Sequence, residues 1–264
     1  MDSHVVDDLV LLKHAAGVRA EDAAARLLAA STDPVRSVFA TPLSATPMRA
    51  PDGRLISLEP RMELAQDANP IPWREIGGLV GRLQAIPRAE VVPLPEHGGR
   101  AAVIAALTAS DTFHPGGSTD ILRELGRTLL RTWPPVGSKT LVHGHLMLST
   151  VGRLPKIPAW LFRDVRTLGV GDASWDLGRP AGLWAAGLLD DQSWTAFAGG
   201  YAQAGGRIDL TGDPLASLDH PARCAVFMAT VREVAACGEY PHIELTETAE
   251  ILLAACVRIN GRRW

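Results

Sequence analysis

The order of two hydrophobic patterns constrains the fold of this 264-residue chain most strongly. Short apolar runs of strand type come first, at 4–12 around an Asp-Asp turn and at 54–60 after a Pro-Asp-Gly turn. From residue 76 onward, apolar residues recur mainly at helical spacing. Strands followed by helices, rather than strands alternating with helices, predict an α+β chain with a small β-containing part and a larger helical part.

The helical pattern predicts several separate elements. An Ala-rich stretch predicts an early helix, and apolar spacing predicts the later ones, at 19–30, 76–83, 121–133, 194–201, 219–236 and 244–259. The runs KTLVHG and AWLFRD are strand-like and interrupt the helical part. The segment 63–72 has the composition of a linker, so we expect one domain over 1–64 and another over 65–264.

Composition argues against nucleic acid and membranes as general partners, although it leaves a local basic patch open. The chain is 47% hydrophobic, has a formal net charge of −3 and a pI near 6.2, which gives no general electrostatic reason to bind nucleic acid or an anionic membrane. The first ten residues are acidic where a signal peptide is basic, and no apolar run reaches about 18 residues. We therefore expect a cytoplasmic protein.

The cysteines and histidines do not predict a metal site. Cys224, Cys237 and Cys256 are widely spaced in helical contexts, which predicts reduced thiols rather than a disulfide framework. His143 and His145 form the one close histidine pair, and their alternation in an extended segment directs them to opposite sides. A zinc site is therefore not expected here.

Several motifs agree with one family in their order and spacing. They are LISLEPRM, WREIGGLVGRLQAIP, LVHGHLMLSTV, LFRDVRTLGVGDASWDL and LLDDQSWTAFAGGYAQAGG. In this succession the chain resembles the aminoglycoside phosphotransferase and choline-kinase-like branch of the protein-kinase-like fold. The resemblance begins near residue 9 and is strongest over 141–206. It implies a two-lobed fold that binds ATP and transfers its γ-phosphoryl group to a hydroxyl.

The resemblance also implies roles for individual residues. Lys13 matches the strand lysine that binds the nucleotide phosphates, and its alternative role is that of a surface lysine. Glu21, with Asp22 as an alternative, matches the helix acid that orients this lysine. Asp164 matches the metal-binding aspartate, and Asp172 matches an aspartate that supports the catalytic loop through hydrogen bonds.

The loop LVHGHLMLST departs from the family pattern where the chemistry is done. His143 and the following glycine keep the start of the loop, so His143 is expected to support it. His145 stands where the family has its catalytic aspartate, and Thr150 stands where it has a metal-binding asparagine. A neutral imidazole can accept a proton, and a hydroxyl can bind Mg²⁺, but the pair of changes favours the loss of normal phosphoryl transfer.

The resemblance further implies a truncated N-lobe. Twelve residues precede Lys13, and none of them is glycine. The family's first strand or strands and its glycine-rich phosphate loop are therefore expected to be missing or supplied by a partner. ATP and Mg²⁺ are expected to bind weakly or not at all.

Three functions are consistent with this sequence. The first is a pseudokinase that binds a partner protein, a peptide or a small molecule, in a setting such as bacterial natural-product biosynthesis. The second is an active but divergent phosphotransferase that uses His145 as its base, on a small-molecule hydroxyl or a peptide Ser or Thr. The third is an interaction scaffold that binds no nucleotide and exposes an apolar patch near residues 1–12. We rank the pseudokinase first.

Overall fold

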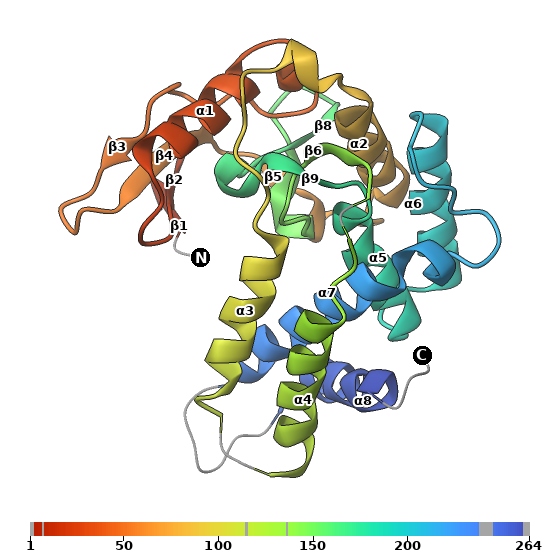
Figure 1. Ribbon diagram of the computed structural model, residues 1–264. Helices are drawn as coiled ribbons and strands as arrows, with labels where there is room; N and C mark the ends of the chain where they lie inside the picture. The colour runs from red at the N-terminus through yellow and green to blue at the C-terminus, as the bar shows by residue number, and fades with distance from the viewer. Residues whose placement is uncertain (1–2, 7, 114–115, 136, 238–244, 261–264) are drawn as a thin grey trace. The chain divides into compact units, whose positions relative to one another are not determined.

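The chain folds into two compact units, each assembled from separate stretches of sequence. The structure is a computed structural model that describes residues 3–6, 8–113, 116–135, 137–237 and 245–260 (Figure 1). Unit 1 comprises Met1–His97, Ser138–Asp176 and Ala196–Asp209, and unit 2 comprises Gly98–Gly137, Leu177–Thr195 and Leu210–Trp264. Within the described residues, no helix is both long and apolar enough to span a membrane.

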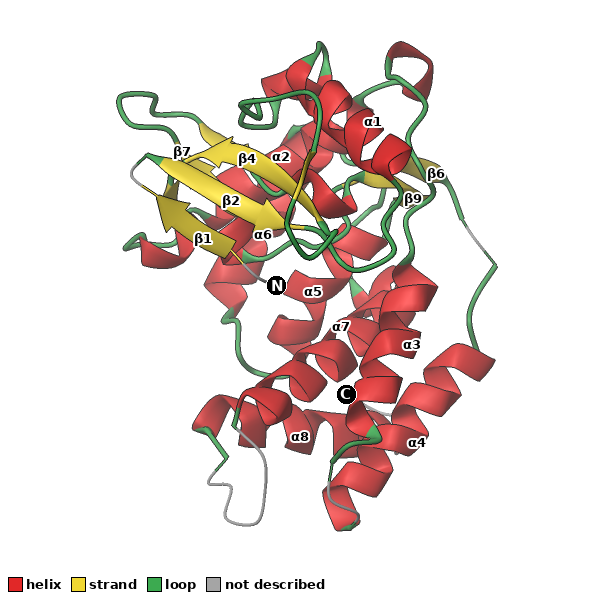
Figure 2. Ribbon diagram, turned by 90° about the vertical axis from the view of Figure 1, so that its left-hand side faces the viewer, coloured by secondary structure: helices red, strands yellow, loops and turns green. Residues whose placement is uncertain are grey.

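The N-terminal sheet of unit 1 is antiparallel, with strand order β1-β2-β4-β3. Figure 2 shows β1, β2 and β4 of this sheet side by side. Its strands are β1 (Ser3–Val6), β2 (Leu9–Lys13), β3 (Met48–Arg49) and β4 (Leu55–Pro60). Val10 and Leu12 of β2 are buried and lie opposite Glu59 and Ser57 of β4. The helix α1 (Ala20–Ser31) contacts β4. One face of the sheet is therefore buried, and it carries a carboxylate as well as apolar side chains.

Two smaller sheets in unit 1 hold the segment that includes LVHGHLMLST. One has the order β5-β7-β8 and the other pairs β6 with β9, all antiparallel. The strands are β5 (Glu63–Leu64), β6 (Lys139–Val142), β7 (Val151–Arg153), β8 (Trp160–Phe162) and β9 (Gly169–Asp172). Short 3₁₀ turns connect the elements of this unit: η1 (Val35–Ser37), η2 (Ala65–Asp67), η3 (Arg88–Glu90), η4 (Leu148–Thr150) and η5 (Val165–Thr167).

Glycines let two helical segments of unit 1 approach closely. These are α2 (Trp73–Ala85) and the part of α6 (Asp191–Gln203) that belongs to this unit. A Cβ on Gly77 would clash with the carbonyl of Phe197, and a Cβ on Gly200 would clash with the carbonyl of Arg74. The two backbones are therefore in direct contact here.

Unit 2 is helical. Its main helices are α3 (Gly99–Ser110), α4 (Gly117–Arg131), α7 (Leu215–Ala236) and α8 (Glu247–Asn260), and α5 (Trp175–Ala185) lies mostly within it. The pairs α7 and α8, α3 and α4, α3 and α7, and α4 and α8 pack together. Within this core a Cβ on Gly126 of α4 would approach the ring of Phe227 to 2.6 Å, so a glycine is needed for this packing.

The sequence predicted most of these elements. The paired strands near 4–12, the strand at 55–60 and the helices at 19–30, 76–83, 194–201 and 219–236 are confirmed. The helix expected over 121–133 is α4, which ends at Arg131. The helix expected over 244–259 runs from Glu247, and residue 244 lies outside the described residues. The thiols are free, with Cys224 and Cys256 buried and Cys237 half-buried.

Two features of the fold were not predicted. The sequence pattern did not predict the helix α3, because GRAAVIAALTAS has little apolar periodicity. The segment 63–72 has a linker's composition, yet it begins with β5, because β5 pairs with the distant β7. The division at residue 64 stays a prediction about lobes, and the compact units have different bounds.

We predict that Gly200→Ala destabilises the protein by about 1–3 kcal/mol, because the new methyl group must push the backbones of α2 and α6 apart. The neighbouring Gly199→Ala is the matched control, since only the Arg74 guanidinium lies near its Cβ, at 3.7 Å. In urea unfolding, Gly199→Ala should be neutral or stabilising by up to about 1 kcal/mol, because alanine favours a helix. Equal loss of stability in the two variants would contradict the close contact.

Candidate functional site

The start of the LVHGHLMLST loop is fixed by a buried histidine. The His143 side chain is fully buried, and its ring stacks on that of Phe39 with centroids 5.7 Å apart. Its Nδ1 accepts a hydrogen bond from the backbone N–H of His145, so Nε2 carries the proton and donates to the carbonyl of Arg163 at 2.8 Å. His143 thus ties the loop to the segment that follows β8.

A second buried group, Asp176, holds the same turn. Its two carboxylate oxygens accept the backbone N–H groups of His143 at 2.7 Å and Gly144 at 2.9 Å. Asp172, for which the resemblance implies loop support, accepts the N–H and the hydroxyl of Ser174 just before α5. The Asp176 carboxylate therefore holds the turn at His143 and Gly144.

Gly144 must be glycine. Its φ is +82°, and a Cβ would clash with the ring of His97 and the carbonyl of Thr167. Its carbonyl oxygen lies 3.1 Å from Nε2 of His97 and accepts from the Trp175 indole at 3.2 Å. These contacts hold the loop backbone in place, although His145 and Thr150 differ from the family pattern.

The two loop residues that differ from the family pattern, His145 and Thr150, differ in their burial and hydrogen bonding. His145, which the sequence resemblance aligns with the family's catalytic aspartate, is half-buried. Thr150 is 4% exposed, and its hydroxyl accepts the N–H of Met147 at 3.0 Å while its proton faces the carbonyl of Met147 at 2.8 Å. Because a hydroxyl has only one proton and two lone pairs, the Thr150 side chain is largely used within the loop.

Asp164 is paired with an arginine two residues away. It lies just after β8 with left-handed backbone angles, φ 63° and ψ 73°, and is 6% exposed. Arg166 donates from Nε to one carboxylate oxygen at 2.6 Å and from a terminal nitrogen to the other at 2.7 Å. Burial alone would raise the pKa of Asp164, but the hydrogen bonds and charge of Arg166 outweigh it and lower that pKa.

Glu59, on the buried face of the N-terminal sheet, holds the backbone of this segment. It is 1% exposed, and its oxygens accept the N–H of Asp164 at 2.9 and 3.0 Å and that of Val165 at 3.3 Å. Arg163 contacts the same carboxylate at 3.4 Å. Burial, and then the charge of Asp164, raise the pKa of Glu59.

The structure does not bring Lys13 and Glu21 together. The Lys13 ammonium pairs with Asp52 at 2.9 Å, and Glu21 is exposed in the first turn of α1. The Lys13 carbonyl nevertheless reaches the site, because Arg166 donates to it at 2.6 Å. In α1 it is Arg26 that contacts this region, by donating to the carbonyl of Leu168 at 2.9 Å.

The next residue, His14, points to the other side of the chain. Its side chain is 1% exposed, and within the described residues neither ring nitrogen has a hydrogen-bond partner. Burial lowers its pKa from 6.5 to about 4, and the charges of Arg166 and Arg26 add to this effect while that of Asp164 opposes it. The His14 side chain therefore lies within reach of the charges of the Asp164 segment.

Mg²⁺ does not fit the residues in this arrangement. The carboxylate of Asp164 already has a cation on both oxygens, and the Thr150 hydroxyl bonds within its own loop. Within the part of the chain that the structure describes, no group of three or more His, Cys, Asp or Glu side chains could hold a metal ion. Glu59, Arg166 and His14 were not predicted, although a charged residue at an inward position of the strand LISLEP was a usable signal.

Solved structures share this fold over nearly the whole chain. The choline kinase LicA from Streptococcus pneumoniae is 12% identical, covers 98% of this chain and 89% of its own, and has a TM-score of 0.59. A choline/ethanolamine kinase family protein from Mesorhizobium loti is 16% identical, with coverage of 96% and 88% and a TM-score of 0.56. The amicoumacin kinase hAmiN, solved with AMP-PNP, Ca²⁺ and Ami, is 13% identical, with coverage of 96% and 82% and a TM-score of 0.62.

These likenesses establish the fold that the sequence resemblance implied. The chain has the α+β, protein-kinase-like fold of choline kinases and aminoglycoside and macrolide phosphotransferases, with small sheets and a helical majority. No protein-family model matches the chain, and no curated protein matches it in sequence.

We predict that His14 makes the protein sensitive to acid. A pKa near 4 in the folded state and 6.5 in the unfolded state means that unfolded chains bind more protons between these values, so stability falls as pH drops from about 6.5 to 4. The loss should be on the order of 3 kcal/mol. His14→Leu should remove this part of the pH dependence in denaturant unfolding measured from pH 7 to 4. An unchanged slope would show that His14 is not buried in its neutral form.

Proposed function

We propose that this protein is a pseudokinase: a phosphotransferase-fold protein that binds a ligand without transferring a phosphoryl group. The observation that carries the proposal is the bidentate contact of Arg166 with Asp164. On this proposal the Arg166 guanidinium takes the place of the divalent cation that a phosphotransferase needs, and it neutralises the Asp164 carboxylate. A metal could bind Asp164 only after displacing a buried, hydrogen-bonded charge.

Two further observations support the proposal. The ammonium of Lys13 pairs with Asp52, and Glu21 is exposed on α1, so the lysine and glutamate pair that positions ATP phosphates in kinases is not formed. The Thr150 hydroxyl is bonded within the loop. On this proposal ATP and Mg²⁺ bind weakly or not at all, in contrast to the amicoumacin kinase hAmiN, which was solved with AMP-PNP and Ca²⁺.

The proposed ligand is a small molecule or a short peptide. The solved structures named above include a kinase in complex with a small molecule, which supports this class of ligand. A protein partner that binds the N-terminal sheet is a further part of the proposal that rests on the sequence alone. Part of that region, residues 1–2 and 7, lies outside the described residues.

An active, divergent phosphotransferase is the second candidate. It is favoured by the ordered backbone of the loop, in which Asp176 and His143 hold the turn that carries His145. General-base catalysis raises reaction rates by roughly 10²–10⁴-fold, so an imidazole base at His145 would accelerate the transfer. In that case His145→Ala should abolish ATP-dependent modification of a hydroxyl substrate, whereas a pseudokinase retains its function in this variant.

We predict that removing the internal cation creates a metal site. Arg166→Gln leaves the Asp164 carboxylate buried and without its guanidinium, so it should cost about 3–5 kcal/mol without metal. Millimolar Mg²⁺ or Mn²⁺ should recover part of that loss and give binding heat by calorimetry. Wild-type protein should show neither effect.

The matched control is the double variant Asp164→Asn with Arg166→Gln, which removes both charges. It should be more stable than Arg166→Gln and should not respond to metal, since no carboxylate remains at this position. Wild-type protein that binds ATP only with Mg²⁺, and loses this binding in Asp164→Asn, would overturn the proposed function.

A further inference from the structure

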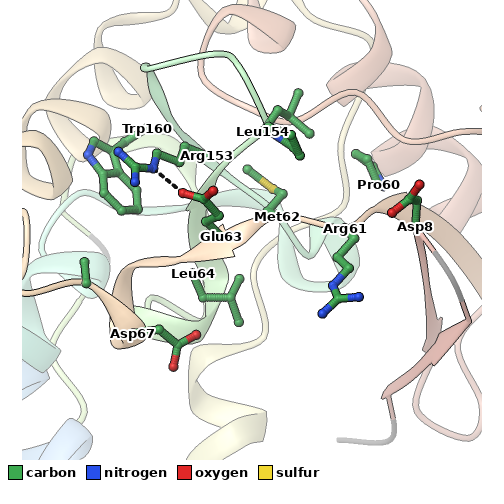
Figure 3. Close-up of a pocket in the computed structure, with 12 residues that line it drawn as sticks. Asp8, Pro60, Arg61, Met62, Glu63, Leu64, Asp67, Arg153, Leu154 and Trp160 are labelled. Carbon is green, nitrogen blue, oxygen red and sulfur yellow. Dashed lines mark hydrogen bonds and ion pairs between the residues drawn. The ribbon is translucent and has the colours of Figure 1, made fainter.

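A recess in unit 1 is lined by other residues than Asp164 and its partners Glu59 and Arg166. Its volume is about 810 Å³, within the range of small-molecule sites. It is lined by the turn before β2, the segment from β4 through β5 to η2, and the hairpin of β7 and β8 (Figure 3). His145, Thr150 and Asp164 are not among the lining residues.

One wall of the recess is a cross-strand row of side chains. Glu63 of β5 pairs in register with Arg153 of β7, which pairs in turn with Trp160 of β8. The Arg153 guanidinium bonds the Glu63 carboxylate at 2.6 Å and lies over the Trp160 ring, 5.4 Å from its centroid (Figure 3). This wall is neutral because its two charges compensate each other.

The other charges of the recess lack such compensation. Arg61, Asp8 and Asp67 are exposed, and among the described residues no ion pair or side-chain hydrogen bond involves them. The backbone N–H of Arg61 donates to the carbonyl of Asp8 at 2.9 Å, which keeps the two residues together. In Figure 3 the side chain of Leu64 lies between those of Asp67 and Arg61. The recess thus offers separated charges of both signs with apolar surface between them.

We propose that this recess binds a short peptide with free termini and apolar side chains. The peptide carboxylate would pair with Arg61, and its ammonium group would pair with Asp67 or Asp8. Apolar side chains would cover Leu64, Leu154 and the exposed part of Trp160. A triphosphate would meet two uncompensated carboxylates and a polycation would meet Arg61, so a ligand with both charges fits best.

The inference deepens the proposed binding function by naming the ligand, and it rests on that function. The probe is the dipeptide Leu-Leu at neutral pH, compared with its N-acetyl form, its C-terminal amide and the doubly blocked form. Calorimetry and ligand-observed NMR at millimolar concentrations should show the free dipeptide binding most tightly. Each blocked terminus should weaken binding about tenfold, as expected for the loss of a charged hydrogen bond.

Charge-removing variants identify the contacts. Arg61→Gln should bind the free dipeptide about as weakly as wild type binds the amide, and blocking the carboxylate should then cause no further loss. Asp8→Asn combined with Asp67→Asn should behave in the same way toward the N-acetyl form. Gln66→Ala, in the same segment but outside the lining, is the control and should bind like wild type.

Several results would overturn the inference. They are the absence of dipeptide binding, equal binding of free and doubly blocked peptides, and ATP binding that Arg61→Gln abolishes while dipeptides do not bind. The result is separable from that for the metal site, because neither Asp164 nor Arg166 lines the recess. Failure of the dipeptide test would leave the Mg²⁺ experiment as an independent test of the pseudokinase proposal.

Discussion

A buried carboxylate on the N-terminal sheet organises the centre of unit 1. Glu59 accepts backbone N–H groups from Asp164 and Val165 and so ties β4 to the segment that follows β8. Two buried carboxylates, Glu59 and Asp164, then lie close together, and each raises the free energy of the other's charged form. Such an arrangement needs a nearby cation. Arg166 supplies it from within the chain, and Arg163 contacts the second carboxylate.

The same electrostatics bears on how the loop is ordered without a bound metal or nucleotide. In a phosphotransferase the negative site is balanced by metal and nucleotide, so without them it carries uncompensated charge. Here the balance is internal, and the loop is held through His143 and through backbone groups bound by Asp176. The backbone geometry and the catalytic charges are therefore supported by different residues. This separation allows His145 and Thr150 to occupy the loop without disturbing its turn.

The sequence predicted the fold well because hydrophobic periodicity and family motifs both report on backbone structure. It predicted the site less well, for reasons visible at particular residues. Lys13 and His14 differ by one position, and in a strand one position reverses the side chain, so the spacing alone did not show which of them faces Asp164. The role of Arg166 depends on the left-handed conformation of Asp164, which turns a neighbour in sequence back onto its carboxylate. Glu59 acts across 105 residues of sequence, beyond the reach of any local pattern.

Internal compensation at Asp164 also bears on where a ligand should bind. A site whose charges are already paired offers a polar ligand little gain, because each new contact must replace one that exists. The recess beside Trp160 differs in this respect. Glu63 and Arg153 form an ion pair there, but within the described residues Arg61, Asp8 and Asp67 have no ion pair. Favourable charge pairing is therefore available to a ligand at Arg61, Asp8 and Asp67 but not at the Asp164 carboxylate.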